Sequence, residues 1–517
     1  MRKKRDPIPR AAEAWWWLGG FLTLGLLGGG VVVAGIALWE NIDIRQLAPA
    51  LAVTSAPTPY PRMSAPAAIA PVPFEAVLLN NDANREYFED AAYYSAELSR
   101  WRGLMEAVGG SVREVSDAEG LLSTSTSEVM VLPEAPCISS PELAAIGAHL
   151  AAGGSVITNW ALGVRDGACE WRGWNTLLDV TGAEDVREIT GRDGTFLTIP
   201  GGLPSSPGID PGTRIELRPD PFLALRMTGQ RVYWSDWALN PNPDEDGAGA
   251  DVAVSTTRSK EGGRITWFGL RTRHAVTEAD SVKLDRLIQN GIMWAAGVPT
   301  ATVGTWPGGA RSALIFTLDV EGVDTYVNAR DAAAVFDLEG LPITFFAVSQ
   351  LVRENAPLAR ALMAAGEVGT QTVDHSPLAG LTWQDQSIRL WRSWSEIEVW
   401  TGVGPAGLRP PEEAFDSLTL AAWKGAGGSY VLSGNEARSA SPELHDTSEG
   451  TLVLLPRLLK DDYTVIVRDI TLRSEHLTDA FLAGAEKMRA IGGLAIITGH
   501  TQIITSGPRL DAVRAVA

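Results

Sequence analysis

An uncharged stretch of 25 residues, from Trp15 to Trp39, is the feature that most constrains how this chain of 517 residues folds. It reads WWWLGGFLTLGLLGGGVVVAGIALW, which is long enough to cross a bilayer as a tilted helix. Lysines and arginines precede it, as expected of a cytoplasmic tail. We therefore expect a tail at residues 1–14, a membrane helix at residues 15–39 and an extracytoplasmic remainder. A cleaved signal peptide is the alternative, but its apolar core is ordinarily shorter.

The residues after this stretch divide into a tether and folded domains. Residues 40–73 are rich in proline and alanine, a composition that cannot build a core and favours an extended linker. The whole chain is 45% hydrophobic and 20% charged, which leaves material for two or three domains. Its formal net charge of -19 argues against nucleic-acid binding, which needs a concentrated positive surface.

The chain has two cysteines, Cys137 and Cys169, which excludes a cysteine-rich zinc site and a network of disulfides. They could form one bridge in an exported protein. The sequence does not give the distance between them, so whether they pair depends on the fold.

Residues 74–304 alternate between short apolar runs and amphipathic segments. EAVLLNN, EVMVLP and SVITNW are typical of buried strands, and RWRGLMEAVGG and ELAAIGAHLAAGG are typical of helices. This alternation predicts a parallel sheet with helices on both faces. We expect a β-rich insertion from about Thr190 to Leu270, with a hairpin that turns at EGG, and a closing helix in DSVKLDRLIQNGIMWAAG.

The run VLPEAPCISSPELAAIGAHLAAGGSVIT resembles the class I glutamine amidotransferase-like and flavodoxin-like folds. An active amidotransferase-like domain would carry a nucleophilic cysteine at the turn that ends the strand SVITNW. This chain has Trp160 there, whereas Cys137 lies in an earlier loop and Cys169 several residues too late. The resemblance therefore implies a non-catalytic relative with a structural or ligand-binding role. A regulatory or protein-interaction role is the weaker alternative.

Residues 305–517 return to strand and helix alternation and contain five distinctive stretches. In chain order they are IFTLDVEG, LPITFFAVSQ, AAGEVGTQTVDHSPL, GLRPPEEAF and GGLAIITGH. Together they resemble the polysaccharide deacetylase family, also called the NodB-homology or carbohydrate esterase family 4 fold. The resemblance implies a distorted (β/α) barrel that removes acetyl groups from N-acetylated sugars. It also implies one divalent metal ion, which an aspartate and two histidines usually hold in this family.

Two carboxylates separated by one residue, Asp319 and Glu321, end the first of these stretches. Alternate side chains of an extended chain share a face, so we expect the two to lie close together. By the resemblance, Asp319 is the catalytic base that activates a water molecule, and Glu321 is a ligand of the metal ion. Glutamate stands where the family usually has aspartate, and its extra methylene displaces the ligating oxygen.

The stretch QTVDHS departs furthest from the family, whose motif has two histidines four residues apart, one helical turn from each other. His375 matches the second metal ligand, but Gln371 stands in place of the first. A glutamine offers a neutral carbonyl oxygen, which suits hard cations better than zinc. The predicted metal site is therefore Glu321, Gln371 and His375, around zinc or a harder divalent cation and with weakened affinity.

Arg409 lies in the stretch LRPP and matches a further catalytic position of the family. The resemblance implies that it pairs with Asp319, orients it and keeps it ionised. Glu412 and Glu413 follow, where the family usually has an aromatic residue and a glycine. They imply altered substrate contacts, which could favour a cationic, partly deacetylated polymer.

His500 ends the apolar run LAIITG and matches the family's general acid, which protonates the leaving amine. The stretch LLPRLLKDDYTVIVRD is the region where a partner for this histidine is expected. Either Asp461 or Asp462 could orient it, and the sequence does not decide between them.

The leading interpretation is a membrane-anchored, extracytoplasmic protein that removes N-acetyl groups from an envelope or exported polysaccharide in a metal-dependent reaction. It predicts a single-pass location in the cell membrane, a polysaccharide as substrate or ligand, and envelope proteins as further partners. The alternative is a catalytically impaired relative that binds glycan or acts as a scaffold in an envelope assembly. Gln371 and the pair Glu412 and Glu413 favour that alternative, because a fold does not fix a function.

Overall fold

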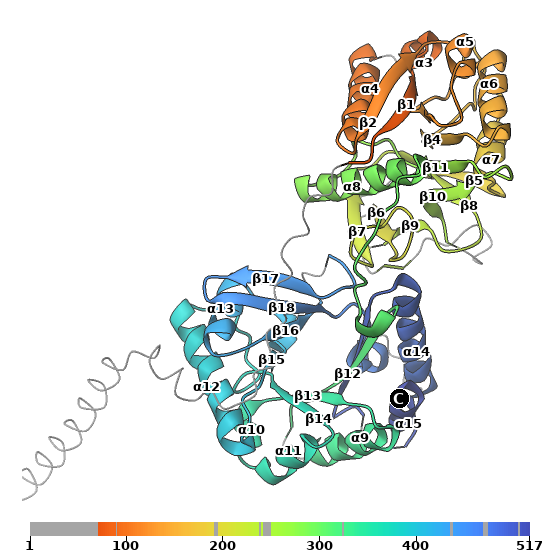
Figure 1. Cartoon of the computed structure of the whole chain (residues 1–517). Helices are drawn as coiled ribbons and strands as arrows, with labels where there is room; N and C mark the ends of the chain where they lie inside the picture. The colour runs from red at the N-terminus through yellow and green to blue at the C-terminus, as the bar shows by residue number, and fades with distance from the viewer. Residues whose placement is uncertain are drawn as a thin grey trace, which may run out of the picture. The chain divides into compact units, whose positions relative to one another are not determined.

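The structure is a computed structural model, and it describes residues 71–517 except residues 89, 191–194, 237–238, 241–249, 323–324, 435–437, 469–473 and 505–506. The predicted cytoplasmic tail, the membrane helix and nearly all of the tether lie outside the described residues. None of the described helices is both long and apolar enough to span a membrane. The described strands belong to two sheets, and the change from one to the other falls between Phe268 and Ala313 (Figure 1).

The first sheet has 11 strands and combines a parallel half with an antiparallel half. The parallel half has the order β2-β1-β3-β4-β11, and the antiparallel half continues as β10-β9-β6-β7. β8 also pairs with β10, and β5 pairs with β8. The strands are β1 (Phe74–Leu79), β2 (Gly110–Val115), β3 (Val129–Leu132), β4 (Ser155–Asn159), β5 (Asp185–Thr190), β6 (Thr195–Ile199), β7 (Thr213–Leu217), β8 (Pro221–Arg226), β9 (Val232–Ser235), β10 (Val252–Arg258) and β11 (Arg264–Phe268).

Helices cover both faces of the parallel half, as predicted. In β3, Val129 and Val131 belong to one apolar cluster, whereas Met130 and Leu132 belong to another. A strand whose successive side chains are all apolar is buried on both faces, because alternate side chains point to opposite sides. The helices are α3 (Asp82–Tyr87), α4 (Ala91–Glu106), α5 (Ala118–Leu122), α6 (Ser140–Ala151), α7 (Asn175–Thr181) and α8 (Glu278–Ala295).

The β-rich region predicted between residues 190 and 270 is present and extends the same sheet. The predicted hairpin is β10 with β11, which pair antiparallel on either side of a turn that contains Glu261 and Gly262. β11 is also parallel to β4, so the hairpin joins the two halves of the sheet. The predicted closing helix is α8.

Cys137 and Cys169 form a disulfide, which settles the pairing that the sequence left open. Cys137 follows β3 and Cys169 follows β4, so the bridge ties together two loops at the same edge of the sheet.

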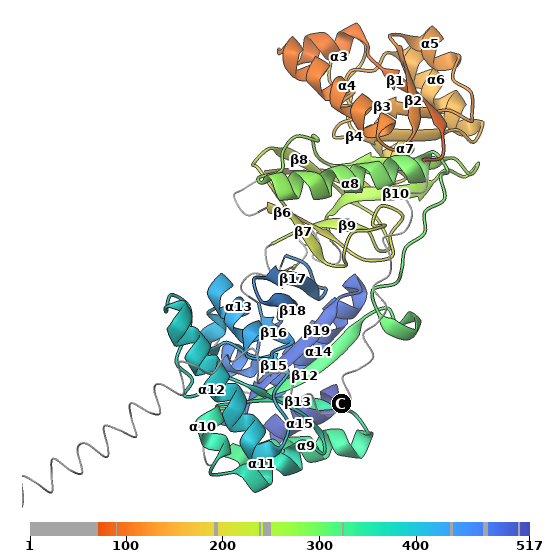
Figure 2. The same ribbon diagram turned by 60° about the vertical axis from the view of Figure 1, so that its left-hand side comes forward.

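The second sheet has 8 strands in the order β17-β18-β16-β15-β14-β13-β12-β19, all parallel to their neighbours except β17. It is curled, and among the described strands β17 and β19 form its two ends, so it is an open half-barrel and not a closed barrel (Figure 2). The strands are β12 (Ala313–Val320), β13 (Ile343–Ala347), β14 (Gly366–Thr370), β15 (Gly407–Leu408), β16 (Tyr430–Ser433), β17 (Glu443–Thr447), β18 (Gly450–Pro456) and β19 (Leu494–His500).

Helices follow the outside of this curled sheet (Figures 1 and 2). They are α9 (Tyr326–Glu339), α10 (Ser349–Val352), α11 (Ala356–Leu362), α12 (Trp383–Thr401), α13 (Ser417–Gly425), α14 (Ser474–Ile491) and α15 (Pro508–Val516), with short turns η2 (Pro307–Gly309), η4 (Pro411–Glu413) and η5 (Thr464–Arg468).

The alternation of side chains in β12 separates a core face from a polar face. Phe316, Leu318 and Val320 belong to the main apolar cluster of this region. Thr317 and Asp319 therefore point to the opposite side of the strand. The Thr317 hydroxyl is 2.9 Å from the Thr498 hydroxyl on β19, so the polar faces of β12 and β19 lie side by side.

Candidate active site

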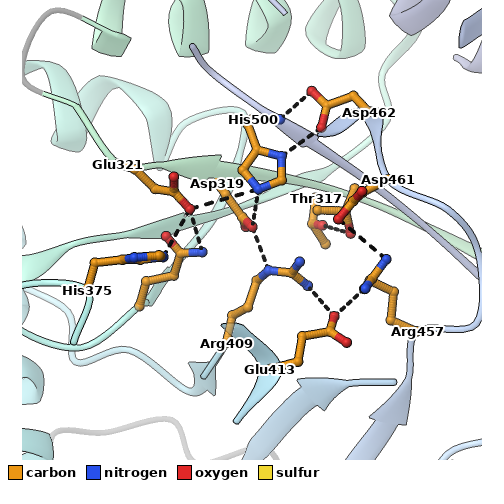
Figure 3. A network of polar contacts seen from close by, with 12 residues as sticks. Thr317, Asp319, Glu321, His375, Arg409, Glu413, Arg457, Asp461, Asp462 and His500 are labelled. Atoms are coloured by element: carbon orange, nitrogen blue, oxygen red, sulfur yellow. Dashed lines mark hydrogen bonds and ion pairs between the residues drawn. The ribbon is translucent and has the colours of Figure 1, made fainter. Parts of the chain in front are cut away.

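The carboxyl ends of neighbouring parallel strands bring most of the predicted site residues together (Figure 3). Asp319 on β12 and His500 at the end of β19 are paired in register. Gln371 follows β14 directly and Arg409 follows β15 directly, with the Arg409 amide donating to the carbonyl of Thr370 at 2.9 Å. In a parallel sheet such ends meet at one edge, where ligands commonly bind.

Asp319 is fully buried and paired with Arg409, as expected. The Nε of Arg409 donates to Oδ2 of Asp319 at 2.5 Å, and Oδ1 is buried without a hydrogen-bond partner among the described residues. Burial raises the pKa of Asp319, and the positive charges of Arg409 and His500 oppose this only in part. Arg409 therefore orients Asp319 and lowers its pKa, as expected, but does not cancel the effect of burial.

His500 is held by Asp462, which settles the choice between the two adjacent aspartates. Its Nδ1 lies 2.6 Å from Oδ1 of Asp462, and its backbone amide donates to Oδ2 at 2.7 Å. Burial disfavours the charged imidazole, but the hydrogen bond to Asp462 and the charges of Asp319, Asp462 and Glu321 raise the pKa of His500 to about 9. The imidazole therefore carries its proton at neutral pH, with Nε2 3.6 Å from Asp319.

Glu321 is the centre of the predicted metal site. Its Oε1 lies 3.1 Å from Nε2 of His375 and accepts from Nε2 of Gln371 at 3.4 Å. Its Oε2 accepts from Nε2 of Gln502 at 2.7 Å, a contact that no short motif indicates. Burial favours the neutral acid, but the hydrogen bond and charge of His375 and the charge of His500 outweigh it and lower the pKa of Glu321 to about 2. The carboxylate is therefore anionic and converges with both other predicted ligands.

The segment that carries Gln371 and His375 is a turn and not the helical turn expected from the spacing of the motif. Thr372 and His375 have backbone φ angles of 69° and 63°, in the left-handed region that residues other than glycine rarely adopt. These two reversals of the backbone, and not a helical repeat, bring His375 back to Glu321.

The donors around Glu321 fit a divalent cation. The Oε1 of Gln371 is buried and has no hydrogen-bond partner among the described residues, which leaves a strong acceptor unsatisfied beside an anionic carboxylate. Asp319, Glu321 and His500 also offer ligand atoms that lie within 4.8 Å of one another. Asp319 is already paired with Arg409, so the set that the motifs predict, Glu321 with Gln371 and His375, is the better set of donors. The hydrogen bond to Glu321 raises the pKa of His375, so a bound ion would displace the proton of this imidazole.

Glu413 and Arg457 extend the site in a way that the motifs did not indicate. The Glu413 carboxylate lies 3.5 Å from Nη1 of Arg409 and accepts a hydrogen bond from Nε of Arg457 (Figure 3). The Nη1 of Arg457 lies 3.6 Å from Oδ2 of Asp461. The Glu413 side chain is 12% exposed. Two arginines already engage the Glu413 carboxylate, so this acid acts within the chain. Glu412 is exposed.

A comparison with known protein families matches the part of the chain that carries most of these residues. Residues 310–431 match the polysaccharide deacetylase family, whereas a search of curated proteins gave no match. A protein of Mycobacterium smegmatis described as a polysaccharide deacetylase is similar in structure, at 23% identity and a TM-score of 0.37, over 42% of this chain and 86% of the other.

Two further solved structures are similar over the same share of the chain. One is a family 4 carbohydrate esterase from Streptomyces lividans in complex with acetate, at 15% identity and a TM-score of 0.28, over 40% of this chain and 85% of the other. The second is a carbohydrate esterase family 4 pseudoenzyme from Bacillus anthracis, at 14% identity and a TM-score of 0.30, over 43% of this chain and 65% of the other. From the sequence match, residues 310–431 of this chain are a polysaccharide deacetylase domain.

Proposed function

We propose that this protein hydrolyses the N-acetyl groups of an envelope or exported polysaccharide, with a divalent metal ion as cofactor. The observation that carries the proposal is the pairing of Asp319 with His500 on adjacent strands, each held by a separate partner of opposite charge. An aspartate whose pKa is raised and a histidine that holds its proton are the two groups that hydrolysis of an amide requires.

In this reaction Asp319 removes a proton from the water molecule that adds to the acetyl carbon. His500 then gives the proton on Nε2 to the amide nitrogen, the carbon–nitrogen bond breaks, and acetate and a free amine leave. Arg409 holds Asp319 in place through Oδ2, and Asp462 fixes the His500 ring through Nδ1, so that Nε2 faces the reaction. Asp462 also stabilises the charged imidazole.

A divalent ion held by Glu321, Gln371 and His375 would polarise the acetyl carbonyl and lower the pKa of the attacking water. Within the chain, Gln502 fixes the second oxygen of Glu321, which leaves Oε1 directed at Gln371 and His375. The protein thus presents one carboxylate, one amide and one imidazole from one edge of the sheet.

The proposal places the described residues outside the cytoplasmic membrane, with the chain anchored by the predicted helix at residues 15–39. The disulfide between Cys137 and Cys169 supports this location, because such bonds form and persist in oxidising compartments and are rare in the cytosol.

A binding or scaffold role without catalysis is the second candidate, and Gln371 favours it. Its Nε2 donates to Glu321, and a metal ion held by both residues would have to displace this hydrogen bond, whereas an imidazole at residue 371 would be a stronger ligand.

The two candidates are separated by acetate release from chitotetraose, measured with the full chain in detergent and with zinc, manganese or magnesium added in turn. We expect metal-dependent release, at least about a hundredfold slower in Asp319→Asn and in His500→Gln. Elemental analysis of the same samples, with His375→Ala as the control, measures metal content. Binding of the sugar without acetate release under any of the metals would favour the scaffold.

A further inference from the structure

Two residues at the carboxyl edge of the first sheet have a strained backbone. Glu134 follows β3 with a φ angle of 42°, and Trp160 follows β4 with a φ angle of 52°. A residue in this conformation is strained and persists only where the surrounding structure imposes it, most often at functional sites. In the sheet, β2 and β3 lie on opposite sides of β1, so the strand order reverses at β1. The carboxyl ends of the strands next to such a reversal commonly bind ligands in α/β proteins.

The Glu134 carboxyl group is fully buried and incompletely satisfied. Its two oxygens lie 2.8 Å and 2.9 Å from the Tyr93 hydroxyl, the one hydrogen-bond donor that the described residues supply to them. A single hydroxyl proton cannot fill the acceptor capacity of a carboxyl group. The Glu134 amide donates to Oδ1 of Asn159 at 2.9 Å, which fixes the strained backbone in this position. The group is therefore held rigidly and fixes the position of the Tyr93 hydroxyl.

Aromatic rings and a guanidinium group lie next to this carboxyl group. The guanidinium carbon of Arg271 is 5.6 Å from the ring centre of Tyr93 and 5.4 Å from that of Trp160. The Trp160 ring is fixed by its indole N–H, which donates to the carbonyl of Pro221 at 2.9 Å. Tyr93, Trp160 and Arg271 are half-buried, so a molecule in solution reaches their exposed parts, with Glu134 directly behind Tyr93.

The charges of this cluster balance, which identifies the class of ligand. Arg271 is paired with Asp220 through two hydrogen bonds, so neither charge is left to attract an ion. Burial and the neighbouring Glu97 raise the pKa of Glu134 to about 8, so its carboxyl group is mostly neutral and both donates and accepts. His274 lies 3.5 Å from Asp220, and burial lowers its pKa, so it adds no charge at neutral pH.

We propose that Tyr93, Trp160 and Arg271, with the buried Glu134 positioning the Tyr93 hydroxyl, form a binding site for an uncharged pyranose unit of a glycan. A sugar has hydroxyl groups for the Tyr93 hydroxyl and the Arg271 guanidinium group, and it has an apolar face of C–H groups for the aromatic rings. The site lies on the first sheet and uses none of the residues assigned to hydrolysis. It would hold the polysaccharide by a second contact within the same chain and raise its effective concentration at the deacetylase domain.

The test is hydrogen–deuterium exchange of the full chain in detergent, with chitotetraose and cellotetraose as probes. Asp319→Asn is present in every sample so that no acetyl group is removed during the measurement. We expect either sugar, at concentrations of about 1–10 mM, to slow exchange in peptides that contain Tyr93, Glu134, Trp160 or Arg271.

Two variants and a control assign any protection to the site. Tyr93→Phe removes the hydroxyl group that Glu134 positions, and Trp160→Ala removes the ring; each should weaken sugar binding about tenfold. The control is Trp171→Ala, because this tryptophan of the same region is 53% exposed and packs on Trp174 and Arg165, and not on Tyr93, Trp160 or Arg271. Thermal unfolding verifies that each variant is folded, and Tyr93→Phe still tests the site if Trp160→Ala does not fold.

The outcomes also separate this site from the proposed deacetylase activity. Protection at Glu134 and Trp160 supports the site even if no acetate is ever released. Protection confined to residues 305–517, no protection with either sugar, or equal loss of binding in Trp171→Ala and Tyr93→Phe would each overturn it.

Discussion

Asp319 and His500 are paired in register on adjacent parallel strands, and Nε2 of the histidine lies 3.6 Å from Oδ2 of the aspartate. Arg409 contacts the aspartate and Asp462 contacts the histidine, so each member of the pair has its own partner of opposite charge. A separate partner therefore influences the pKa of each group, and a mutation can remove one partner without the other.

The protonation of His500 should stabilise the fold in a definite pH window. Its pKa is raised from an ordinary value of 6.5 to about 9, so its contribution is fully present below pH 6.5 and is lost as the pH rises through 9. The free energy of unfolding should decrease by on the order of 2 kcal/mol across this window, relative to His500→Gln. Urea denaturation of both proteins at several pH values measures the difference. Parallel curves for the two proteins would contradict the assignment.

Asp462 should set the alkaline limit of activity if the proposed reaction occurs. Asp462→Asn removes the charge that favours the imidazolium form, so the pKa of His500 should decrease and the alkaline limb of kcat/KM should move to lower pH by about 1 unit or more. Asp461→Asn is a matched control, because the adjacent aspartate contacts Arg457 and not the imidazole. An equal shift in both variants would show that general charge, and not the contact, sets the limit.

Glu413 should be a stability determinant, unlike its neighbour Glu412. Glu413→Gln leaves the mostly buried Arg409 and Arg457 next to each other without the anion between them, which should cost about 3 kcal/mol of unfolding free energy. Glu412→Gln makes the same chemical change at an exposed position and should stay within about 0.5 kcal/mol of the parent. Chemical denaturation measures the free energy of unfolding of both variants. The prediction is wrong if the two variants lose equal stability.

The resemblance to the polysaccharide deacetylase family predicted Asp319, Arg409 and His500 at one site, and the structure shows that each follows or ends a parallel strand. Once the strands are parallel neighbours, their carboxyl ends must meet, and the register between β12 and β19 follows from burial of Phe316 and Leu318 on the core face.

The contacts that the sequence did not predict are those between loops. Glu413 and Arg457 are separated by 44 residues, and no local pattern indicates that they meet. Asp461 and Asp462 are adjacent, so composition cannot distinguish them, and only the backbone after β18 decides which one reaches His500. The segment from Gln371 to His375 was expected to be helical, because a spacing of four residues fits one helical turn. In the structure, positive φ angles at Thr372 and His375 bring the two side chains to Glu321 without a helix.

Gln371→His tests whether the metal site is one ligand short of the family pattern. An imidazole at this buried position would replace an amide that donates to Glu321 with a stronger ligand for zinc, so zinc affinity should rise at least about tenfold. Calorimetry with zinc on the full chain in detergent, with and without the substitution, gives the ratio directly. His375→Ala in the Gln371→His background is the control, since it removes the imidazole 3.1 Å from Glu321 and should abolish the gain. If Gln371→His binds zinc no better than the parent, the turn does not direct residue 371 at the ion, and the ligand set proposed around Glu321 is wrong.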